Sequence, residues 1–261
     1  MKIAIGFFGL IRSLKYTHES IKENLLNILE NNGHQYDIYM HTYDLKILTN
    51  KRSHEKDIVL DVMDYKLLDP KEIIIDNQDN FDKLFNYKKI MQYGDAWQDS
   101  NDNFASLKNL IRQLNSLKKL TQMLDKKPKY DIYIYLRPDL KIISPFNVKW
   151  LNLKSNEIAT PKYFKHCGIN DRFVISKFQE LKIYGTRIDE IFNYCIVKKN
   201  IYSKRPLHNS KQVEDNDKTR PLHSESLVKY VLNKNRIKNI DLDIKLVRVR
   251  ANGVEVVHDY K

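Results

Sequence analysis

The chain has 261 residues, of which 42% are hydrophobic and 30% charged, a composition typical of a globular protein and not of a disordered one. No apolar run reaches the ~18 residues that a membrane-spanning helix needs, and the first residues lack the cleavage site of a signal peptide. The two cysteines, Cys167 and Cys195, have no C-x-x-C spacing, which favours a reduced, cytoplasmic protein over a zinc or disulfide scaffold.

The formal net charge of +12 has two explanations. Lysine dispersed among asparagine and isoleucine is typical of compositional bias and would only solvate the surface. A basic protein also favours a polyanionic partner, which would be nucleic acid, an anionic membrane surface or a small phosphate-bearing substrate. The charge alone leaves both explanations open.

In the first half of the chain, short apolar runs alternate with helical patterns. We expect strands at residues 2–7, 36–44, 72–76 and 130–136, a helix that opens at Thr17 and ends at Gly33, and a long helix from Asn103. This alternation predicts βαβ units and a single α/β, Rossmann-like domain with a mostly parallel central sheet flanked by helices. Ligands of such sheets bind outside the carboxyl ends of the strands.

Beyond residue 150 the periodicity weakens. We expect a strand at 171–176, a helix at 188–197 and a short helix at 224–235 with Ser224 as its N-cap. Residues 244–250 and 254–258 are typical of late strands, joined in a hairpin around Asn252-Gly253. Residues 198–223 have almost no apolar periodicity, which predicts a long mobile loop: a lid, a binding loop or a disordered segment.

The most informative motif ends the most apolar strand. The stretch YDIYIYLRPDL, residues 130–140, places Arg137, Pro138 and Asp139 where a buried strand should avoid charge. Ionised groups there must pair, face a solvated cleft, or bind a ligand or metal. Arg137 suits phosphate, and Asp139 suits a divalent cation that bridges a diphosphate. A purely structural ion pair is the alternative.

Other polar residues flank the first strands. The first strand ends in GFFGLIRS, where Gly6 and Gly9 would let backbone approach a ligand and Arg12 would meet phosphate; the alternative is a tight strand exit. Tyr43, at the end of the second strand, could stack on a base. For Arg112 and Ser116, at i and i+4 on the long helix, contact with a nucleotide competes with an ordinary solvated position.

Acidic candidates follow in the second half. Asn170 and Asp171 precede a strand-like run, so Asp171 could act as a general base or bind sugar hydroxyls, although turn residues are common there. Glu225 opens a predicted helix, where a carboxylate also suits the helix dipole. His258 is a lone candidate metal ligand.

Six stretches occur in the order found in a family of small GT-A-type glycosyltransferases: KIAIGFFGLIRS, YDIYMHTYD, YDIYIYLRPDL, GINDRFVIS, HSESLVKYVL and IKLVRVR. From residue 2 to about 250, with a gap in the 45–100 region, the chain resembles these enzymes of capsule, lipopolysaccharide and large-virus glycan synthesis. The resemblance implies a hexosyl- or pentosyltransferase of GT-A fold. It would move a sugar from a nucleotide-sugar, UDP-sugars favoured, to a hydroxyl of a glycan or glycolipid acceptor.

The resemblance also implies which residues act. Residues 1–150 would bind the nucleotide and 151–261 the sugar and acceptor, with Asp171, then Glu225, as the catalytic base. The nucleotide-sugar would contact Gly6, Phe7, Gly9, Arg12, Ser13, Tyr43, Arg112, Ser116, Arg137, Asp139 and Asn170. The triplet at 137–139 stands where many members carry Asp-x-Asp, so either Asp139, with His258 as a further candidate, holds Mn²⁺ or Mg²⁺, or Arg137 takes over part of the cation's role.

We expect no nucleic-acid partner and no transmembrane segment, with room for a peripheral membrane contact. Two alternatives stay open. One is a basic nucleic-acid-binding protein, which the net charge of +12 and the tyrosine-rich strands would suit, although no binding motif of that class is present. The other is an inactive nucleotide-binding scaffold of the same fold.

Overall fold

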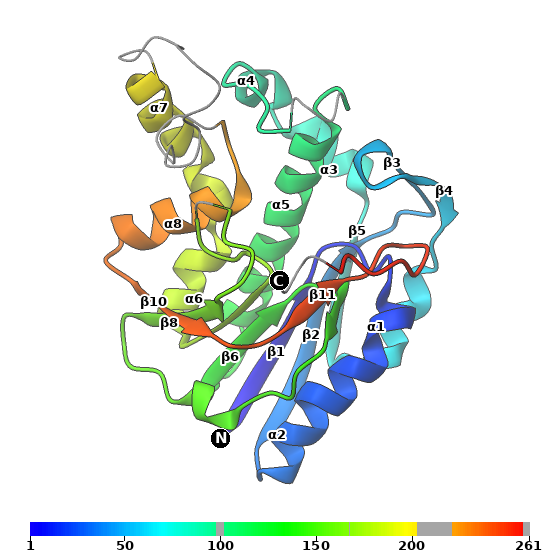
Figure 1. Cartoon of the computed structure of the whole chain (residues 1–261), viewed down its shortest axis with the longest axis vertical. Coiled ribbons are helices and arrows are strands. Elements are labelled where there is room, and N and C mark those ends of the chain that lie inside the picture. Colours follow the sequence, from blue (N-terminus) through cyan, green and yellow to red (C-terminus); the bar gives the residue numbers. More distant parts are fainter. Residues whose placement is uncertain (98–101, 167, 203–220, 258–261) are drawn as a thin grey trace.

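The computed structural model describes residues 1–97, 102–166, 168–202 and 221–257, and its centre is a seven-stranded sheet. The strand order is β10-β8-β9-β6-β1-β2-β5 (Figure 1). The strands are β1 Lys2–Phe8, β2 Gln35–Tyr43, β5 Glu72–Asp76, β6 Ile132–Leu136, β8 Glu157–Pro161, β9 Phe173–Ser176 and β10 Lys238–Leu242. Only the pairs made by β9 are antiparallel. The predicted α/β class with a mostly parallel sheet is confirmed.

Helices cover both faces of this sheet (Figure 1). One face carries α1 Leu14–Ile21, a π-helical stretch Lys22–Leu26 and α2 Asn27–Asn31. The other carries α5 Ala105–Asp125, α6 Phe178–Gly185 and α8 Ser224–Lys234. Three further helices, α3 Gln78–Leu84, α4 Tyr87–Met91 and α7 Ile191–Tyr202, pack with the first half of α5.

The sequence of strand β6 is apolar throughout because both of its faces are buried. Ile132, Ile134 and Leu136 belong to the core cluster of α1 and α2. Tyr133 and Tyr135 alternate with them and belong to the cluster of α5 and α6. Because alternate residues face opposite sides of a strand, a strand covered by helices on both faces needs apolar side chains at every position.

Short elements surround the sheet. A hairpin is formed by β3 Ile47–Asn50 and β4 Glu55–Val59, and a second two-stranded sheet pairs β7 Leu140–Ile142 with β11 Leu246–Arg248. Turns of 3₁₀-helix lie at Lys51–Ser53, Val62–Leu68, Val148–Leu151 and Arg187–Glu190. Among the described residues, no helix combines the length and the apolar character needed to cross a bilayer.

Several sequence-based boundaries were wrong. Residues 198–202, assigned to a loop, continue helix α7, because the buried Ile191, Tyr194 and Cys195 anchor that helix at helical spacing. Residues 203–220 of the expected loop lie outside the described residues, as does Cys167. The predicted late hairpin is reduced to one bridge, between Val249 and Glu255.

Candidate functional site

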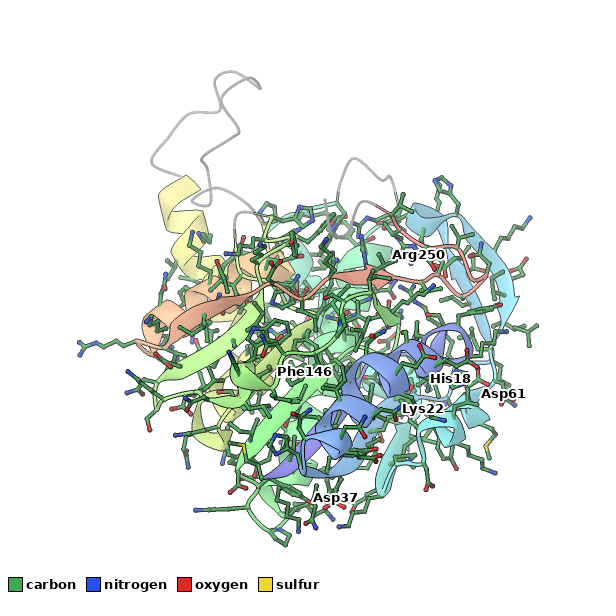
Figure 2. The ribbon with its side chains drawn as sticks, turned by 60° about the horizontal axis from the view of Figure 1, so that its bottom comes forward. His18, Lys22, Asp37, Asp61, Phe146 and Arg250 are labelled. Carbon is green, nitrogen blue, oxygen red and sulfur yellow. The ribbon has the colours of Figure 1, made fainter. Side chains whose placement is uncertain are left out.

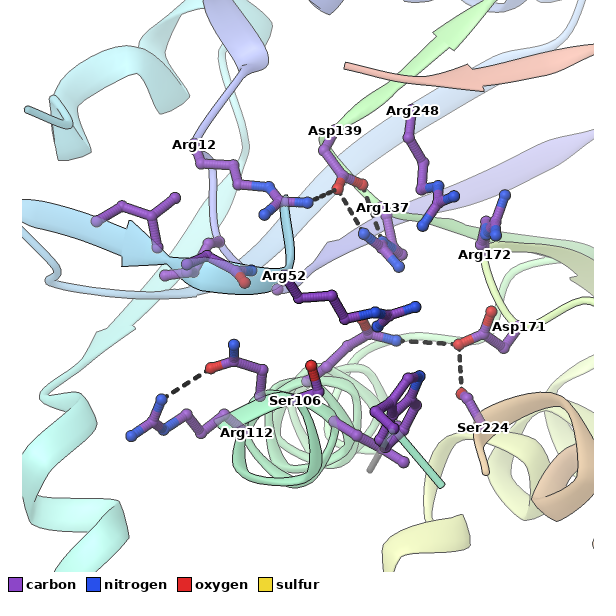
Figure 3. A pocket seen from close by; sticks show the side chains of 18 of the residues that line it. Arg12, Arg52, Ser106, Arg112, Arg137, Asp139, Asp171, Arg172, Ser224 and Arg248 are labelled. Atoms are coloured by element: carbon purple, nitrogen blue, oxygen red, sulfur yellow. Dashed lines mark hydrogen bonds and ion pairs between the residues drawn. The ribbon is translucent and has the colours of Figure 1, made fainter. Parts of the chain in front are cut away.

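A cleft of about 940 Å³ opens at the carboxyl ends of β1, β2 and β6 (Figure 3). The β3–β4 hairpin, the first half of α5, the start of α8 and the end of β11 complete its wall. This is the edge at which α/β sheets bind ligands. The predicted site residues that line it are Gly9, Arg12, Tyr43, Arg112, Arg137, Asp139, Asp171 and Glu225.

The Arg-Pro-Asp triplet lies in a buried network of four charges. Asp139 accepts hydrogen bonds from Nε and Nη2 of Arg137, with 2.9 Å between Nε and Oδ1. Arg12 donates to Asp139 Oδ2 at 2.8 Å and to Glu55 Oε2 at 3.3 Å (Figure 3 shows the bonds to Asp139). Both carboxylates are buried. Two guanidinium groups and two carboxylates therefore balance one another.

Electrostatics keep Asp139 ionised. Burial alone would raise the pKa of this carboxyl, because a charge loses its hydration in the interior. The charges and hydrogen bonds of Arg137 and Arg12 outweigh burial and hold the pKa of Asp139 well below its usual range. Asp139 is thus a permanent counter-ion for the two arginines.

This arrangement does not fit a divalent cation at Asp139. Both carboxylate oxygens already accept bonds from guanidinium groups, and a cation would have to displace an arginine. Mg²⁺ and Mn²⁺ prefer several oxygen ligands. The described part of the chain holds no group of three or more His, Cys, Asp or Glu side chains able to bind a metal, and His258 lies outside it.

Asp171 lies just before β9, beside the first turn of α8. Its Oδ2 accepts hydrogen bonds from Gln113 Nε2 at 3.2 Å and from Ser224 Oγ (Figure 3). Burial raises the pKa of this carboxyl, but the charges of Arg137 and Arg172 outweigh burial and lower it overall. Asp171 is therefore an oriented, ionised carboxylate at the edge of the cleft.

The second acidic candidate, Glu225, lines the same cleft one residue further along α8. Its Oε2 lies 3.0 Å from His223 Nδ1, an ion pair when the imidazole is protonated. His223 in turn lies edge-on to His166, with 6.0 Å between ring centroids. The start of α8 thus brings a second candidate base to the cleft.

Three predicted binding residues, Gly6 and Phe7 of β1 and Ser116 of α5, lie behind the cleft wall. Phe7 is fully buried in the core, and a Cβ at Gly6 would come within 2.7 Å of Leu120 and Tyr135. Gly6 is therefore needed for the close packing of α5 on β1. Ser116 Oγ accepts a hydrogen bond from the Gly9 amide at 2.8 Å and so holds the turn, where Gly9 has a φ of +98°.

Two others also act behind the wall. Ser13 Oγ donates to the Val249 carbonyl at 2.7 Å and ties the exit of β1 to the end of β11. Asn170 Nδ2 donates to the Tyr163 carbonyl at 3.0 Å, while its Oδ1 accepts from the Arg172 amide at 2.9 Å. Neither side chain lines the cleft; each shapes the backbone that does.

Tyr43 and Arg112 line the cleft with their polar atoms engaged. Tyr43 Oη donates to the Arg112 carbonyl at 3.0 Å and accepts from Asn115 Nδ2 at 2.8 Å. Arg112 Nε donates to Asp82 Oδ1 at 3.1 Å, and Nη2 donates to Oδ2 of the same carboxylate. Arg112 thus clamps α5 to α3, and Tyr43 presents a ring whose hydroxyl is already satisfied.

The cleft holds more arginine than the sequence reading assigned to it. Among the described residues it is lined by seven arginines and four carboxylates: Arg12, Arg52, Arg112, Arg137, Arg172, Arg248 and Arg250, with Asp95, Asp139, Asp171 and Glu225. Arg248 and Arg250 were missed because the stretch IKLVRVR was taken only as a strand. Their i, i+2 spacing was the available signal, since alternate strand residues share a face.

An aromatic rim borders these charges. Arg52 lies over the Trp97 ring, 5.4 Å from its centroid, and Trp97 lies 5.4 Å from the ring of His223. Flat rings beside a cationic cleft suit stacking with a nucleobase or a sugar.

A scan with protein-family models and a search of curated proteins both find no match for this chain.

Proposed function

We propose that the chain is a glycosyltransferase that moves a sugar from a nucleotide-sugar, a UDP-sugar first, to a hydroxyl of a glycan or glycolipid. One observation carries the proposal: the cleft at the carboxyl edge of the sheet joins a cluster of arginines to the buried carboxylates of Asp171 and Glu225. A departing diphosphate needs positive charge, and an acceptor hydroxyl needs a base. The ordered stretches that resemble GT-A enzymes support the same function.

Asp171 is the first candidate for the base. In this mechanism its carboxylate takes the proton of the acceptor hydroxyl while the oxygen attacks the anomeric carbon and the bond to the nucleoside diphosphate breaks. The low pKa of Asp171 arises largely from Arg137 and Arg172, once burial is overcome. Phosphate bound near Arg137 would cancel part of that field and raise the pKa of Asp171 towards a value useful for proton transfer. Glu225 is the second candidate.

Arginine, in this proposal, neutralises the leaving diphosphate without a cation on Asp139. One guanidinium group can donate two parallel hydrogen bonds to phosphate oxygens, and it stays charged at any physiological pH. The engaged oxygens of Asp139 support this choice over a metal-bridged diphosphate. Mn²⁺ would then be dispensable for nucleotide binding.

A thermal-shift panel tests the proposal. It compares UDP, GDP, dTDP, CMP and a short oligonucleotide, each with Mn²⁺ and with EDTA. A ligand at ~100 times its dissociation constant stabilises the folded state by about 2.7 kcal/mol, so binding appears as a higher melting temperature. We expect a shift with one nucleoside diphosphate, in EDTA as well as Mn²⁺.

Other outcomes would contradict parts of the proposal. A shift only with the oligonucleotide would favour the nucleic-acid-binding alternative. A nucleotide shift that requires Mn²⁺ would overturn the metal-free version. Nucleotide binding without release of nucleoside diphosphate from any UDP-sugar, across a panel of glycan acceptors, would favour the inactive scaffold.

A further inference from the structure

The buried network around Asp139 leaves little net charge for a ligand. Arg12 and Arg137 face Asp139 and Glu55, so two positive charges meet two negative ones. Arg112 is likewise paired with Asp82. The excess positive charge of the cleft must therefore come from other arginines.

We propose that Arg250, with Arg248 beside it, forms the anion subsite of this cleft and binds a phosphate or diphosphate group. The two residues belong to the end of β11 and the segment that follows it. This inference shares the cleft of the proposed glycosyltransferase and rests on that function only for the identity of the natural ligand.

The backbone fixes both arginines in place. Arg248 pairs with Leu140 of β7, and the Val249 amide donates to the Asp139 carbonyl at 2.8 Å. The side chain of Val249, between the two arginines, is buried. Because alternate residues of an extended segment face opposite sides, Arg248 and Arg250 share the other side, and both line the cleft. Figure 2 shows Arg250 on the segment that follows β11. The pair is thus carried by a braced strand end.

Arg250 differs from the arginines of the buried network. Its guanidinium forms no hydrogen bond or ion pair within the described residues, although its side chain is half-buried in the cleft wall. Burial and the neighbouring charges of Arg248 and Arg12 lower its pKa to about 10, against partial relief from Asp139 and Glu55. Holding a partly buried cation among like charges costs free energy, and a bound anion would remove that cost.

Because the charge of Arg250 costs free energy in the ligand-free protein, replacing Arg250 should affect stability differently from replacing a structural arginine. Removing a structural, ion-paired arginine destabilises the folded protein, because its partner is left uncompensated. Removing Arg250 relieves repulsion with Arg248 and Arg12. We therefore expect Arg250→Gln to weaken anion binding while the melting temperature of the ligand-free protein stays equal to or above that of the parent.

Calorimetric titration with inorganic pyrophosphate tests the subsite directly. We expect the parent to bind pyrophosphate, Arg250→Gln to bind it at least about tenfold more weakly, and Arg250→Lys to keep part of the affinity. Arg236→Gln is the matched control, because it removes one charge from an exposed arginine outside the cleft. It should bind pyrophosphate as the parent does.

Three results would overturn the subsite. The parent fails to bind pyrophosphate; Arg250→Gln binds it as tightly as Arg236→Gln does; or Arg250→Gln melts well below both proteins, which would make Arg250 a structural residue. Arg250→Lys guards against a folding defect, since it keeps the charge and loses only the paired donors.

Further titrations separate the sources of the phosphate and the two proposals. If Arg250→Gln weakens UDP and leaves uridine unchanged, the subsite holds the donor diphosphate; if only pyrophosphate is affected, it holds an anionic group of the acceptor. Arg250-dependent pyrophosphate binding without affinity for any nucleoside diphosphate would sustain the subsite and contradict the proposed function. Tight, Arg250-dependent oligonucleotide binding would identify nucleic acid as the source.

Discussion

At the scale of single residues, the triplet at 137–139 contributes to the site through charge balance. The sequence predicted that these charges need partners, because a strand as apolar as residues 130–136 cannot end in Arg-Pro-Asp without them. Pairing of Arg137 with Asp139 was one of the alternatives that the sequence offered, but Arg12 and Glu55 were not predictable as partners. Arg12 comes from the exit of β1 and Glu55 from a short hairpin, and only the fold brings these distant segments together.

The base assignment is tested by Asp171→Asn. Asparagine keeps the shape and can still bond Ser224 and Gln113, but it cannot accept a proton from the acceptor. We expect sugar transfer to fall at least about 100-fold, with the dissociation constant of the nucleotide within about twofold of the parent. Single-turnover transfer and calorimetric nucleotide titration measure the two effects. Survival of transfer would move the role to Glu225, whose replacement Glu225→Gln is the companion variant.

The structural weight of the network is tested by Asp139→Asn. Loss of this carboxylate leaves Arg12 and Arg137 short of a buried counter-ion, a defect that typically costs about 3–5 kcal/mol. Urea unfolding at pH 7 measures the change. Asp243→Asn is the control, because Asp243 forms an exposed pair with Lys162, and exposed ion pairs contribute little to stability. Equal effects of the two substitutions would show that the network is not structural.

The same carboxyls set a pH dependence. Asp139 and Asp171 have folded-state pKa values below the ordinary 3.8, so at low pH the unfolded chain binds more protons than the folded one. Their contribution to stability is complete well above pH 3.8 and is lost as the pH falls below it. Unfolding free energies measured between pH 6 and about pH 3 should fall less steeply for Asp139→Asn than for the parent, and parallel curves would contradict this origin.

At the scale of elements, segments with a clear apolar pattern were predictable, and segments fixed mainly by pairing with distant parts of the chain were not. The strands at 36–44, 72–76 and 130–136 and the leucine-rich helix from Asn103 carry enough apolar residues at the right spacing to be recognised. Strands β7, β8 and β10 are three to five residues long and are fixed by pairing with distant segments. Arg248 and Arg250 lie in a stretch that was recognised as a strand, and they were missed because their alternate spacing was not read as a shared face.

The β3–β4 hairpin owes its position over the cleft to Glu55. Besides Arg12, this carboxylate accepts hydrogen bonds from Ser53 Oγ and, at 2.7 Å, from the Ala251 amide after β11. Glu55→Gln removes the charge that binds Arg12 while one amide oxygen remains to accept. We expect faster amide hydrogen exchange across residues 47–59 and unchanged exchange in β1 and β6. Unchanged exchange in the hairpin would mean that its own strand pairing holds it.

At the scale of the whole molecule, the net charge of +12 includes lysines on the surface and arginines in the cleft, and the two groups act differently on a ligand. Lysines scattered over the surface raise the rate and strength of association with any polyanion, and this effect is screened by salt. The cleft arginines act at short range on one or two phosphates. A nucleotide enzyme and a nucleic-acid-binding protein can share a basic groove, but they differ in how many phosphates that groove contacts.

Salt dependence separates them. An oligonucleotide held by 6–10 phosphate contacts loses about 10³–10⁵ in affinity between 50 and 200 mM salt. UDP offers two phosphates, so its affinity for this cleft should fall by less than about tenfold over the same range. Titrations of both ligands in parallel, with Arg236→Gln as the surface-charge control, decide the matter. The proposed enzyme predicts the shallow dependence for UDP and no tight oligonucleotide binding at 200 mM salt, whereas tight, steeply salt-dependent oligonucleotide binding with no UDP affinity would assign the arginines of this cleft to nucleic acid.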